Sequence, residues 1–398
     1  YKTHNMLMKT EALVTPQLIS RARKRRGMTT SEIAAKMNVP SDVVVAWEAG
    51  DKRPTFAQAQ AFAKKLHIPF GYLYLHESPI ERMPLVDFRT TRGGISEPSP
   101  DLLDLLTDVL GKQQWLRDYR RFEGYVHPPF AGRFGITDSE DVIAEDMRDI
   151  LDAEDARKYA HSMDDFLEYL VQNTEESGIA VMRSGVVRGN NHRPLDRAEF
   201  RGFSIHDNIV PLVFINTCDF KWAQIFTLVH EIAHIWIGKG GVSNPDYELQ
   251  YSLQEKPVEL LCNRVAVEML VPRGDLLSYW KTKDVLEENL DGLRKRYKVS
   301  DMIILRQALN NNLIDISEYR MRYAQLVKLT RSVESDTDDV NNSGGDFDSA
   351  LITRNGKMFT EAVINSTVHE DVLWSEAADM LDVKVKEISG IMTYLYGS

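Results

Sequence analysis

The sequence has few cysteines and no long apolar run. Only two of its 398 residues are cysteine, Cys218 and Cys262, too few for a disulfide framework in a chain of this length. No stretch approaches the roughly 18 consecutive apolar residues that cross a bilayer, and the first residues lack the pattern of a secretory signal. These absences argue against disulfide-rich secreted and integral membrane proteins, and they predict a cytoplasmic protein with no membrane partner.

Acidic residues outnumber basic ones over the whole chain, but basic residues are concentrated near its start. The formal net charge is −11, yet residues 16–70 contain ten Lys and Arg against four Asp and Glu. Clustered cations attract phosphate, so this segment is suited to nucleic-acid contact. The alternative interpretation is an ordinary solvated helix surface.

The same segment shows short helices with clear start and stop signals. Pro16 opens a helix that ends before Gly27, and Thr29-Thr30-Ser31-Glu32 has the spacing of a capping box. A third helix starts at Pro40 and ends at Gly50, and a fourth covers residues 56–66. Together with the Trp47-Glu48-Ala49-Gly50 ending, this pattern resembles the Cro/repressor-type helix-turn-helix domain. The resemblance implies a DNA-binding-like domain of five helices.

A contact with DNA would involve the second and third helices and the loop that follows them. However, the third helix offers Val43, Val45 and Ala46 where base-reading helices usually carry Arg, Gln or Asn. Backbone binding, dimerisation and protein docking therefore all remain open. The candidate DNA-binding residues are Thr29, Thr30, Ser41, Asp42, Val43, Lys52 and Arg53.

The chemistry is concentrated in residues 178–272, where a His-Glu-x-x-His motif lies in an apolar helical pattern. His230 and His234 are four residues apart, so both imidazoles project from one helix face and can bind a single metal ion. Glu231 is offset enough to reach a water molecule and act as the general base. The alternative is a pair of buried structural histidines, which would be costly without partners.

Catalytic zinc sites use three protein ligands and keep one position open, so a third ligand is expected downstream. Pro257 begins a second helix that places Glu259 in its first turn. Glu268 is the rival ligand, but it lies more than two turns further along the helix. Asn263, one turn beyond Glu259 on the same face, is predicted to orient a ligating histidine. The sequence thus predicts a Zn²⁺ site formed by His230, His234 and Glu259, with Glu231 as the catalytic residue.

These motifs resemble the ImmA/IrrE family of metallopeptidases, and the fusion to a helix-turn-helix resembles the long single-chain form of that family. The resemblance implies an α+β, mostly helical protein with a zincin-like core that cleaves a repressor or other regulator in phage, mobile-element or stress-response control. Cys262 stands where the family usually has Ala. The residues that carry the likeness are Glu199-Phe-Arg-Gly-Phe203, Phe214-Ile-Asn-Thr217, the His-Glu-x-x-His block, Glu259-x-x-x-Asn263-x-x-Ala266, Leu270-Val-Pro272 and Pro84-Leu-Val-Asp-Phe-Arg-Thr90.

Breaks in composition divide the chain into five segments. The predicted segments are a helix-turn-helix domain (9–76), a linker and helical segment (77–160), a metallopeptidase domain (161–331), a flexible acidic linker (332–348) and a helical C-terminal domain (349–398). In zincins the substrate lies extended beside an edge strand, and residues 210–215 are the expected edge. Four residues are near enough to be candidates for stabilising the oxyanion: His192, Arg201, Tyr247 and Tyr251.

Two other classes of function compete with the peptidase. A DNA-binding regulator with a purely structural zinc site would show a closed set of four ligands. An antitoxin-like or scaffold protein would bind a partner without cutting it. The expected partners are a protein substrate, DNA and a second copy of the chain.

Overall fold

The structure is a computed structural model that describes residues 10–77, 83–87, 98–125, 127–243, 256–282, 285–337 and 347–397, with only the backbone for 330–337. The chain forms two compact units. One consists of the residues up to Met83 together with Glu97–Leu103, and the other of Pro84–Ser96 together with Asp104–Ser398. Among the described helices, none combines the length and the apolar character that a membrane span requires.

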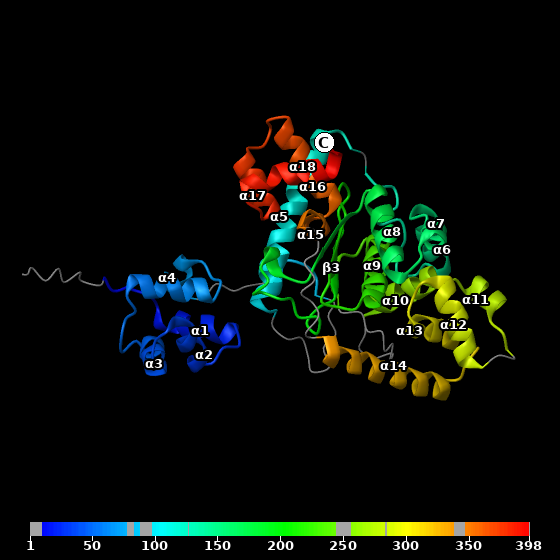
Figure 1. Ribbon diagram of the computed structural model, residues 1–398, viewed down its shortest axis with the longest axis horizontal. Helices are drawn as coiled ribbons and strands as arrows, with labels where there is room; N and C mark the ends of the chain where they lie inside the picture. Colours follow the sequence, from blue (N-terminus) through cyan, green and yellow to red (C-terminus); the bar gives the residue numbers. More distant parts are fainter. Residues whose placement is uncertain are drawn as a thin grey trace, which may run out of the picture. The chain divides into compact units, whose positions relative to one another are not determined.

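The first unit is the predicted array of short helices (Figure 1). Its elements are α1 (Pro16–Arg25), α2 (Thr30–Met37), α3 (Ser41–Ala49), α4 (Phe56–Lys65) and the 3₁₀ helix η1 (Phe70–Tyr74). The capping box of Thr29 and Glu32 is confirmed, and Gly50 ends α3 in the left-handed conformation that the sequence predicted for a glycine there. The fifth expected helix corresponds to η1, which is a 3₁₀ helix rather than an α-helix.

The second unit contains a small mixed sheet with the strand order β1-β3-β2-β4. Its strands are β1 (Ala180–Ser184), β2 (Gly202–Ile205), β3 (Leu212–Asn216) and β4 (Gly241–Ser243). Strand β3 pairs in parallel with β1 and antiparallel with β2, so both of its edges are hydrogen-bonded to neighbouring strands. The prediction that residues 210–215 form a substrate-binding edge is therefore wrong, because this strand lies inside the sheet.

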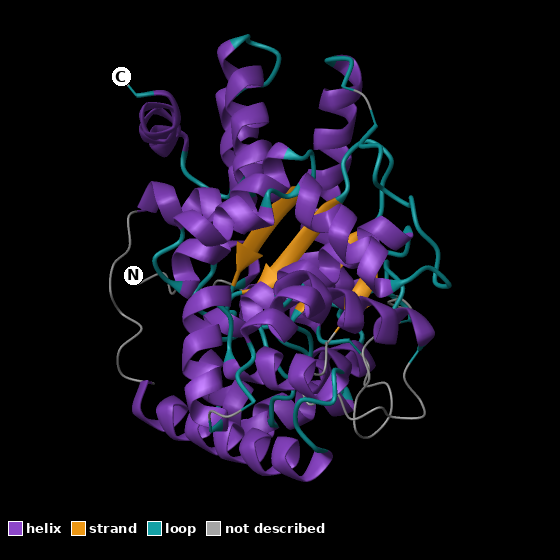
Figure 2. Ribbon diagram, turned by 90° about the vertical axis from the view of Figure 1, so that its right-hand side faces the viewer, coloured by secondary structure: helices purple, strands orange, loops and turns teal. Residues whose placement is uncertain are grey.

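Helices surround this sheet, as Figure 2 shows. Helix α9 (Lys221–Ile237) packs on β2 and β3 and is flanked by α8 (Met163–Glu176), α10 (Pro257–Leu270) and α6 (Glu140–Ile150). Further helices are α7 (Ala153–Tyr159), α11 (Arg273–Tyr279), α12 (Leu286–Tyr297), α13 (Asp301–Asn310) and α14 (Ile316–Thr337). Helix α14 continues through 332–337, where the acidic linker was expected to begin, and residues 338–346 of that predicted linker lie outside the described residues.

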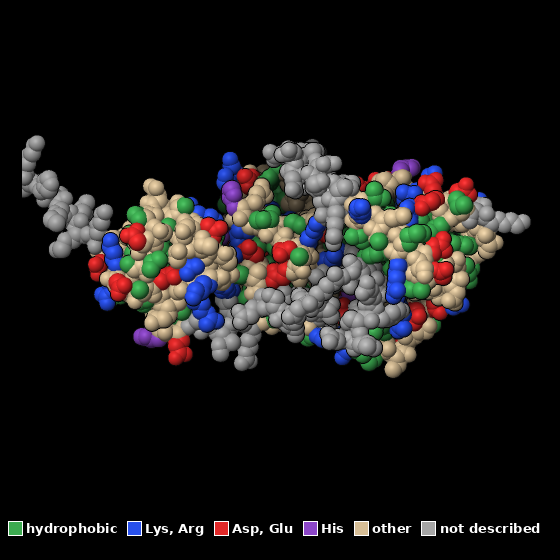
Figure 3. All heavy atoms as spheres, turned by 90° about the horizontal axis from the view of Figure 1, so that it is seen from below, with side chains coloured by type: hydrophobic (Ala, Val, Ile, Leu, Met, Phe, Trp, Pro, Cys, Tyr) green, Lys and Arg blue, Asp and Glu red, His purple; other side chains and the backbone are tan. Residues whose placement is uncertain are grey.

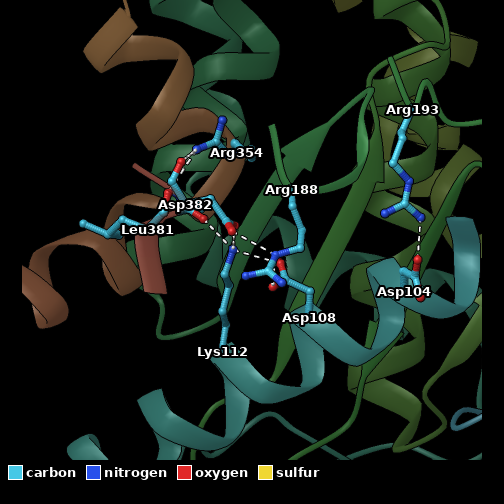
Figure 4. A network of polar contacts seen from close by, with 9 residues as sticks. Asp104, Asp108, Lys112, Arg188, Arg193, Arg354, Leu381 and Asp382 are labelled. Carbon is cyan, nitrogen blue, oxygen red and sulfur yellow. Dashed lines mark hydrogen bonds and ion pairs between the residues drawn. The ribbon is translucent and has the colours of Figure 1, made fainter. Parts of the chain in front are cut away.

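The C-terminal helices dock on α5 (Pro100–Phe122) and on β1. They are α15 (Phe347–Asn355), α16 (Lys357–Val368), α17 (Trp374–Leu381) and α18 (Ile388–Tyr396). Figure 4 shows the polar contacts that accompany this docking. The Lys112 ammonium of α5 lies 2.9 Å from an Asp108 oxygen, 3.0 Å from an Asp382 oxygen and 2.9 Å from Asn355 Oδ1, and Arg188 Nε reaches the same Asp382 carboxylate at 2.9 Å. The predicted C-terminal helical unit is thus fixed to the body by charged as well as apolar contacts.

Candidate metal centre

Helix α9 carries the His-Glu-x-x-His motif through the middle of the second unit. From Ala223 to Ile237 every residue of this helix is buried, because the sheet covers one side and neighbouring helices cover the other. The helix ends at Gly238, which takes a positive φ of 71°. A polar motif in such a helix is expensive unless its groups satisfy one another or bind a ligand.

The two motif histidines lie side by side with their Nε2 atoms 3.1 Å apart. Both side chains are 0% exposed, and the ring centroids are 4.9 Å apart. The i, i+4 spacing thus produces the convergence that the sequence predicted.

Glu259 comes from the first turn of α10, which packs directly against α9. Its carboxylate oxygens lie 3.0 Å from His234 Nε2 and 3.3 Å from His230 Nε2. Burial opposes ionisation of this carboxyl, but the two histidines outweigh it and lower the pKa of Glu259 to about 2. The rival Glu268 instead accepts hydrogen bonds from Gln307 Nε2 and the Arg273 amide.

The three groups have the separations that a tetrahedral ion requires. Donor atoms about 2.0–2.1 Å from a zinc ion lie roughly 3.3 Å from one another in a tetrahedral arrangement. The distances between the two histidine nitrogens and the nearest Glu259 oxygens are 3.0 to 3.3 Å, and these donors form the His-His-Glu group that is able to hold a metal. The donor set therefore fits a cation with two imidazole ligands and one carboxylate.

Glu231 lies beside this group but faces a different partner. Its Oε1 accepts a short hydrogen bond from Ser243 Oγ of β4, and its Oε2 is buried without a hydrogen-bond partner among the described residues. Burial raises the pKa of Glu231 above its ordinary value, which is the direction a general base needs. Ser243 was not predicted, because no motif contains it and β4 is only Gly241–Ser243.

Gly202 of β2 allows the sheet to approach Glu231 closely. A Cβ at this position would lie 2.7 Å from Thr227 Cγ2, 2.9 Å from the Phe214 carbonyl oxygen and 3.2 Å from Glu231 Cγ. A side chain here would force β2 away from α9. Gly202 is part of the Glu199–Phe203 block that the sequence had flagged only by resemblance.

Two protein-family models match this chain. Residues 174–308 match the peptidase family described as the IrrE N-terminal-like domain, and residues 19–73 match the helix-turn-helix family. The chain joins a helix-turn-helix domain to an IrrE N-terminal-like domain. The His-His-Glu group and Glu231 all fall within the matched IrrE N-terminal-like segment, whereas no curated protein matches the sequence.

Two further residues of α10 lie near the candidate metal centre of the IrrE N-terminal-like domain. Asn263 is 1% exposed and follows Glu259 by one helical turn, and its role in orienting a histidine stays a prediction. Cys262 is fully buried, and its thiol contacts His234. Burial raises the pKa of this thiol, which keeps the sulfur neutral.

Of the four candidate oxyanion residues, the structure describes His192 and Arg201. His192 lies on an exposed turn, where its amide binds Asn190 Oδ1. The Arg201 guanidinium forms an ion pair with Asp219 at 2.8 Å. Tyr247 and Tyr251 lie outside the described residues. The structure therefore assigns no oxyanion-stabilising side chain from this set.

In the helix-turn-helix domain, most of the predicted DNA-binding residues are accessible. Thr29, Ser41, Asp42, Lys52 and Arg53 are exposed and Thr30 is half-buried. Val43 packs against the domain core, whereas Val45 is 50% exposed. Figure 3 shows basic and acidic side chains interspersed on the visible face of this domain, at the left. Contact of these residues with DNA stays a prediction.

Proposed function

We propose that the chain is a zinc-dependent endopeptidase that cleaves a repressor or another regulatory protein, and that its helix-turn-helix domain brings it to DNA. The observation that carries the proposal is the convergence of His230, His234 and Glu259 beside an unligated carboxylate, Glu231, in a peptidase-family domain. Three protein ligands leave one coordination position for water or substrate, as in catalytic rather than structural zinc sites.

The protein side chains have distinct tasks in this proposal. A zinc ion held by the two histidines and Glu259 would acidify a water molecule and polarise the scissile carbonyl. Glu231 takes a proton from the attacking water through its Oε2, which has no protein partner among the described residues, and later gives it to the leaving amine. Ser243 holds the other oxygen of Glu231 and so fixes the direction in which Oε2 points.

The substitution Glu231→Gln tests the chemical step. The variant keeps the three metal ligands, so zinc content measured by atomic spectroscopy should stay at one ion per chain, while cleavage falls by at least about 100-fold. The assay incubates the full chain with regulators encoded near its gene and searches for zinc-dependent fragments by mass spectrometry.

Cys262→Ala is the matched control, because it changes a residue that contacts His234 without removing a ligand. Both zinc content and cleavage should persist in this variant. Undiminished cleavage by Glu231→Gln would show that another group is the base.

A further inference from the structure

The outer edge of β4, the strand next to the metal centre, is occupied by another segment of the same chain. β4 pairs with β2 on one side. On its other side the Val242 amide donates to the Val86 carbonyl at 2.8 Å, and Asp87 pairs with Val242 in the parallel sense. The Lys256 ammonium, at the start of α10, adds a contact of 2.5 Å to the Asp87 carbonyl. Two elements that frame the metal centre therefore both hold residues 84–87.

The segment bends at Pro84 and Leu85 and then joins the edge of β4 through a single bridge at Asp87. Side-chain exposure alternates along it, with Leu85 and Asp87 half-buried and Pro84 and Val86 exposed. An alternation of two is the spacing of extended backbone, which agrees with the bridge at Asp87. Pro84 has no amide to donate, which is tolerated only at an edge or at the start of a strand.

The position of this segment matters because β4 leads directly into the catalytic group. Ser243, the residue after Val242, donates to Glu231, and His230, Glu231 and His234 are all 0% exposed. A peptide that adds to an exposed sheet edge uses the same backbone donors and acceptors that residues 86–87 use here. The chain's own segment thus occupies the hydrogen-bonding edge nearest to the proposed catalytic base.

Both neighbours of the segment along the chain belong to the other unit. The described residues up to Met83 and those of 98–103 group with the helix-turn-helix domain, whereas Pro84–Asp87 group with the peptidase body. Within the helix-turn-helix unit, Arg26 donates a 2.8 Å hydrogen bond to the Leu66 carbonyl and forms a short ion pair with Asp101. The ion pair holds residues 98–103, which follow the segment in the chain, to the helix-turn-helix unit. Residues 84–87 thus belong to the peptidase body, while the chain on either side of them leads to the helix-turn-helix unit.

We propose that residues 84–87 are an internal competitor for the peptide-binding edge of β4, and that substrate binding requires their displacement. This inference rests on the proposed peptidase function and adds its regulation. A tethered segment competes at an effective concentration in the millimolar range, so even one backbone hydrogen bond and one hydrogen bond from a lysine side chain can exclude a free peptide. Since the chain on either side of residues 84–87 leads to the helix-turn-helix unit, a change in that unit on binding its partner is able to pull the segment away.

The test measures peptide binding without cleavage. The full chain carrying Glu231→Gln is compared with the same chain carrying in addition Leu85→Gly, Val86→Gly and Asp87→Gly, which weaken strand formation. The probe is a fluorescein-labelled synthetic peptide with the sequence of residues 83–90, titrated by fluorescence polarisation. The triple-glycine chain should bind it about tenfold or more tightly, and hydrogen exchange at the Val242 amide should be faster in that chain before peptide is added.

Two further variants keep the test decisive. Val285→Gly removes an exposed valine at the start of α12 and should leave peptide affinity unchanged. Lys256→Met removes the ammonium donor to Asp87 and should raise peptide affinity by about threefold, which provides a test if the triple-glycine chain does not fold.

Equal peptide affinity in the parent, triple-glycine and Lys256→Met chains, or unchanged exchange at Val242 in a folded triple-glycine chain, would overturn the competitor proposal. The proposed peptidase function is tested in a second assay, which measures cleavage by the same variants with Glu231 in place of Gln. If the peptide results are as expected but no variant cuts a protein, the segment competes as proposed and the peptidase function is wrong.

Discussion

At the scale of single residues, the candidate centre depends on how closely β2 approaches α9. Gly202 has no Cβ, and the space that a Cβ would need is filled by Thr227, the Phe214 carbonyl and Glu231. The carbonyl belongs to β3, the hydrogen-bonded neighbour of β2, so it cannot rotate away as a side-chain tip can. This contact makes the position of Glu231 sensitive to a single methyl group.

The substitution Gly202→Ala should therefore destabilise the protein by about 1 to 3 kcal/mol through overpacking. It should also reduce any cleavage activity by more than it reduces zinc content, because the three atoms nearest to the added Cβ include Glu231 Cγ and no atom of the candidate ligands. Urea denaturation and metal analysis of the full chain measure these effects. Gly292→Ala is the control: a Cβ at Gly292 in α12 meets nothing within 4 Å, so this variant should be neutral or more stable by about 0.5 to 1 kcal/mol.

The candidate metal ligands could be predicted from the sequence because their positions follow from helical spacing. His230 and His234 share one face of α9, and Pro257 set the start of α10 and so placed Glu259 in the first turn. Ser243 and Gly202 were not identified as site residues. Their proximity to Glu231 depends on how β2 and β4 pair across the sheet, and nothing local in the sequence encodes that pairing.

At the scale of elements, the carboxyl of the half-buried Glu175 connects α8 to the C-terminal helices. Glu175 Oε1 accepts the Met358 amide at 3.0 Å, at the start of α16. Burial is the main cause that raises the pKa of Glu175 from 4.5 to about 7. Between these two values the folded protein retains a proton that the unfolded chain has released, so this carboxyl makes the free energy of unfolding fall as the pH rises from 4.5 to 7.

Glu175→Gln should remove that pH dependence while keeping an oxygen to accept the Met358 amide. The variant is expected to gain stability relative to the parent at pH 8, on the order of 1 to 3 kcal/mol, and to gain little at pH 4.5. Urea unfolding at the two pH values checks the difference. Glu176→Gln, at the exposed neighbouring position, should not alter the slope, and an equal gain at both pH values in Glu175→Gln would contradict the assignment.

Helices were predicted more reliably than strands for a physical reason. The amphipathic pattern of residues 101–122 and the apolar block before Pro272 define α5 and α10 locally. The strands β2 and β4 are Gly202–Ile205 and Gly241–Ser243, too short to show a pattern, and β3 was wrongly taken for an edge because strand order is a non-local property. Asn216 ends β3, and its side chain binds the Phe200 carbonyl and the Cys218 amide, so that helix α9 begins only at Lys221.

At the scale of the whole molecule, the candidate metal centre links two successive helices, α9 and α10, that are separated in the chain by β4 and the residues that follow it. α9 supplies two ligands and α10 the third, and α10 also packs against α6 and α13. A ligand that binds only the folded state stabilises it in proportion to the logarithm of its concentration. Metal binding should therefore raise the free energy of unfolding of the entire second unit, in addition to its effect on activity.

Zinc added to chelator-treated protein should raise the free energy of unfolding by about 2.7 kcal/mol when free zinc is 100 times its dissociation constant. Glu259→Ala should abolish most of this increment, because it removes the carboxylate that lies 3.0 to 3.3 Å from both histidine nitrogens. Glu268→Gln, which alters a buried carboxylate bonded to Gln307 and Arg273, should change the baseline stability but leave the zinc increment intact. Thermal unfolding with and without zinc measures both quantities. An increment that survives Glu259→Ala and is lost in Glu268→Gln would reverse the ligand assignment, since only a true ligand couples metal binding to folding.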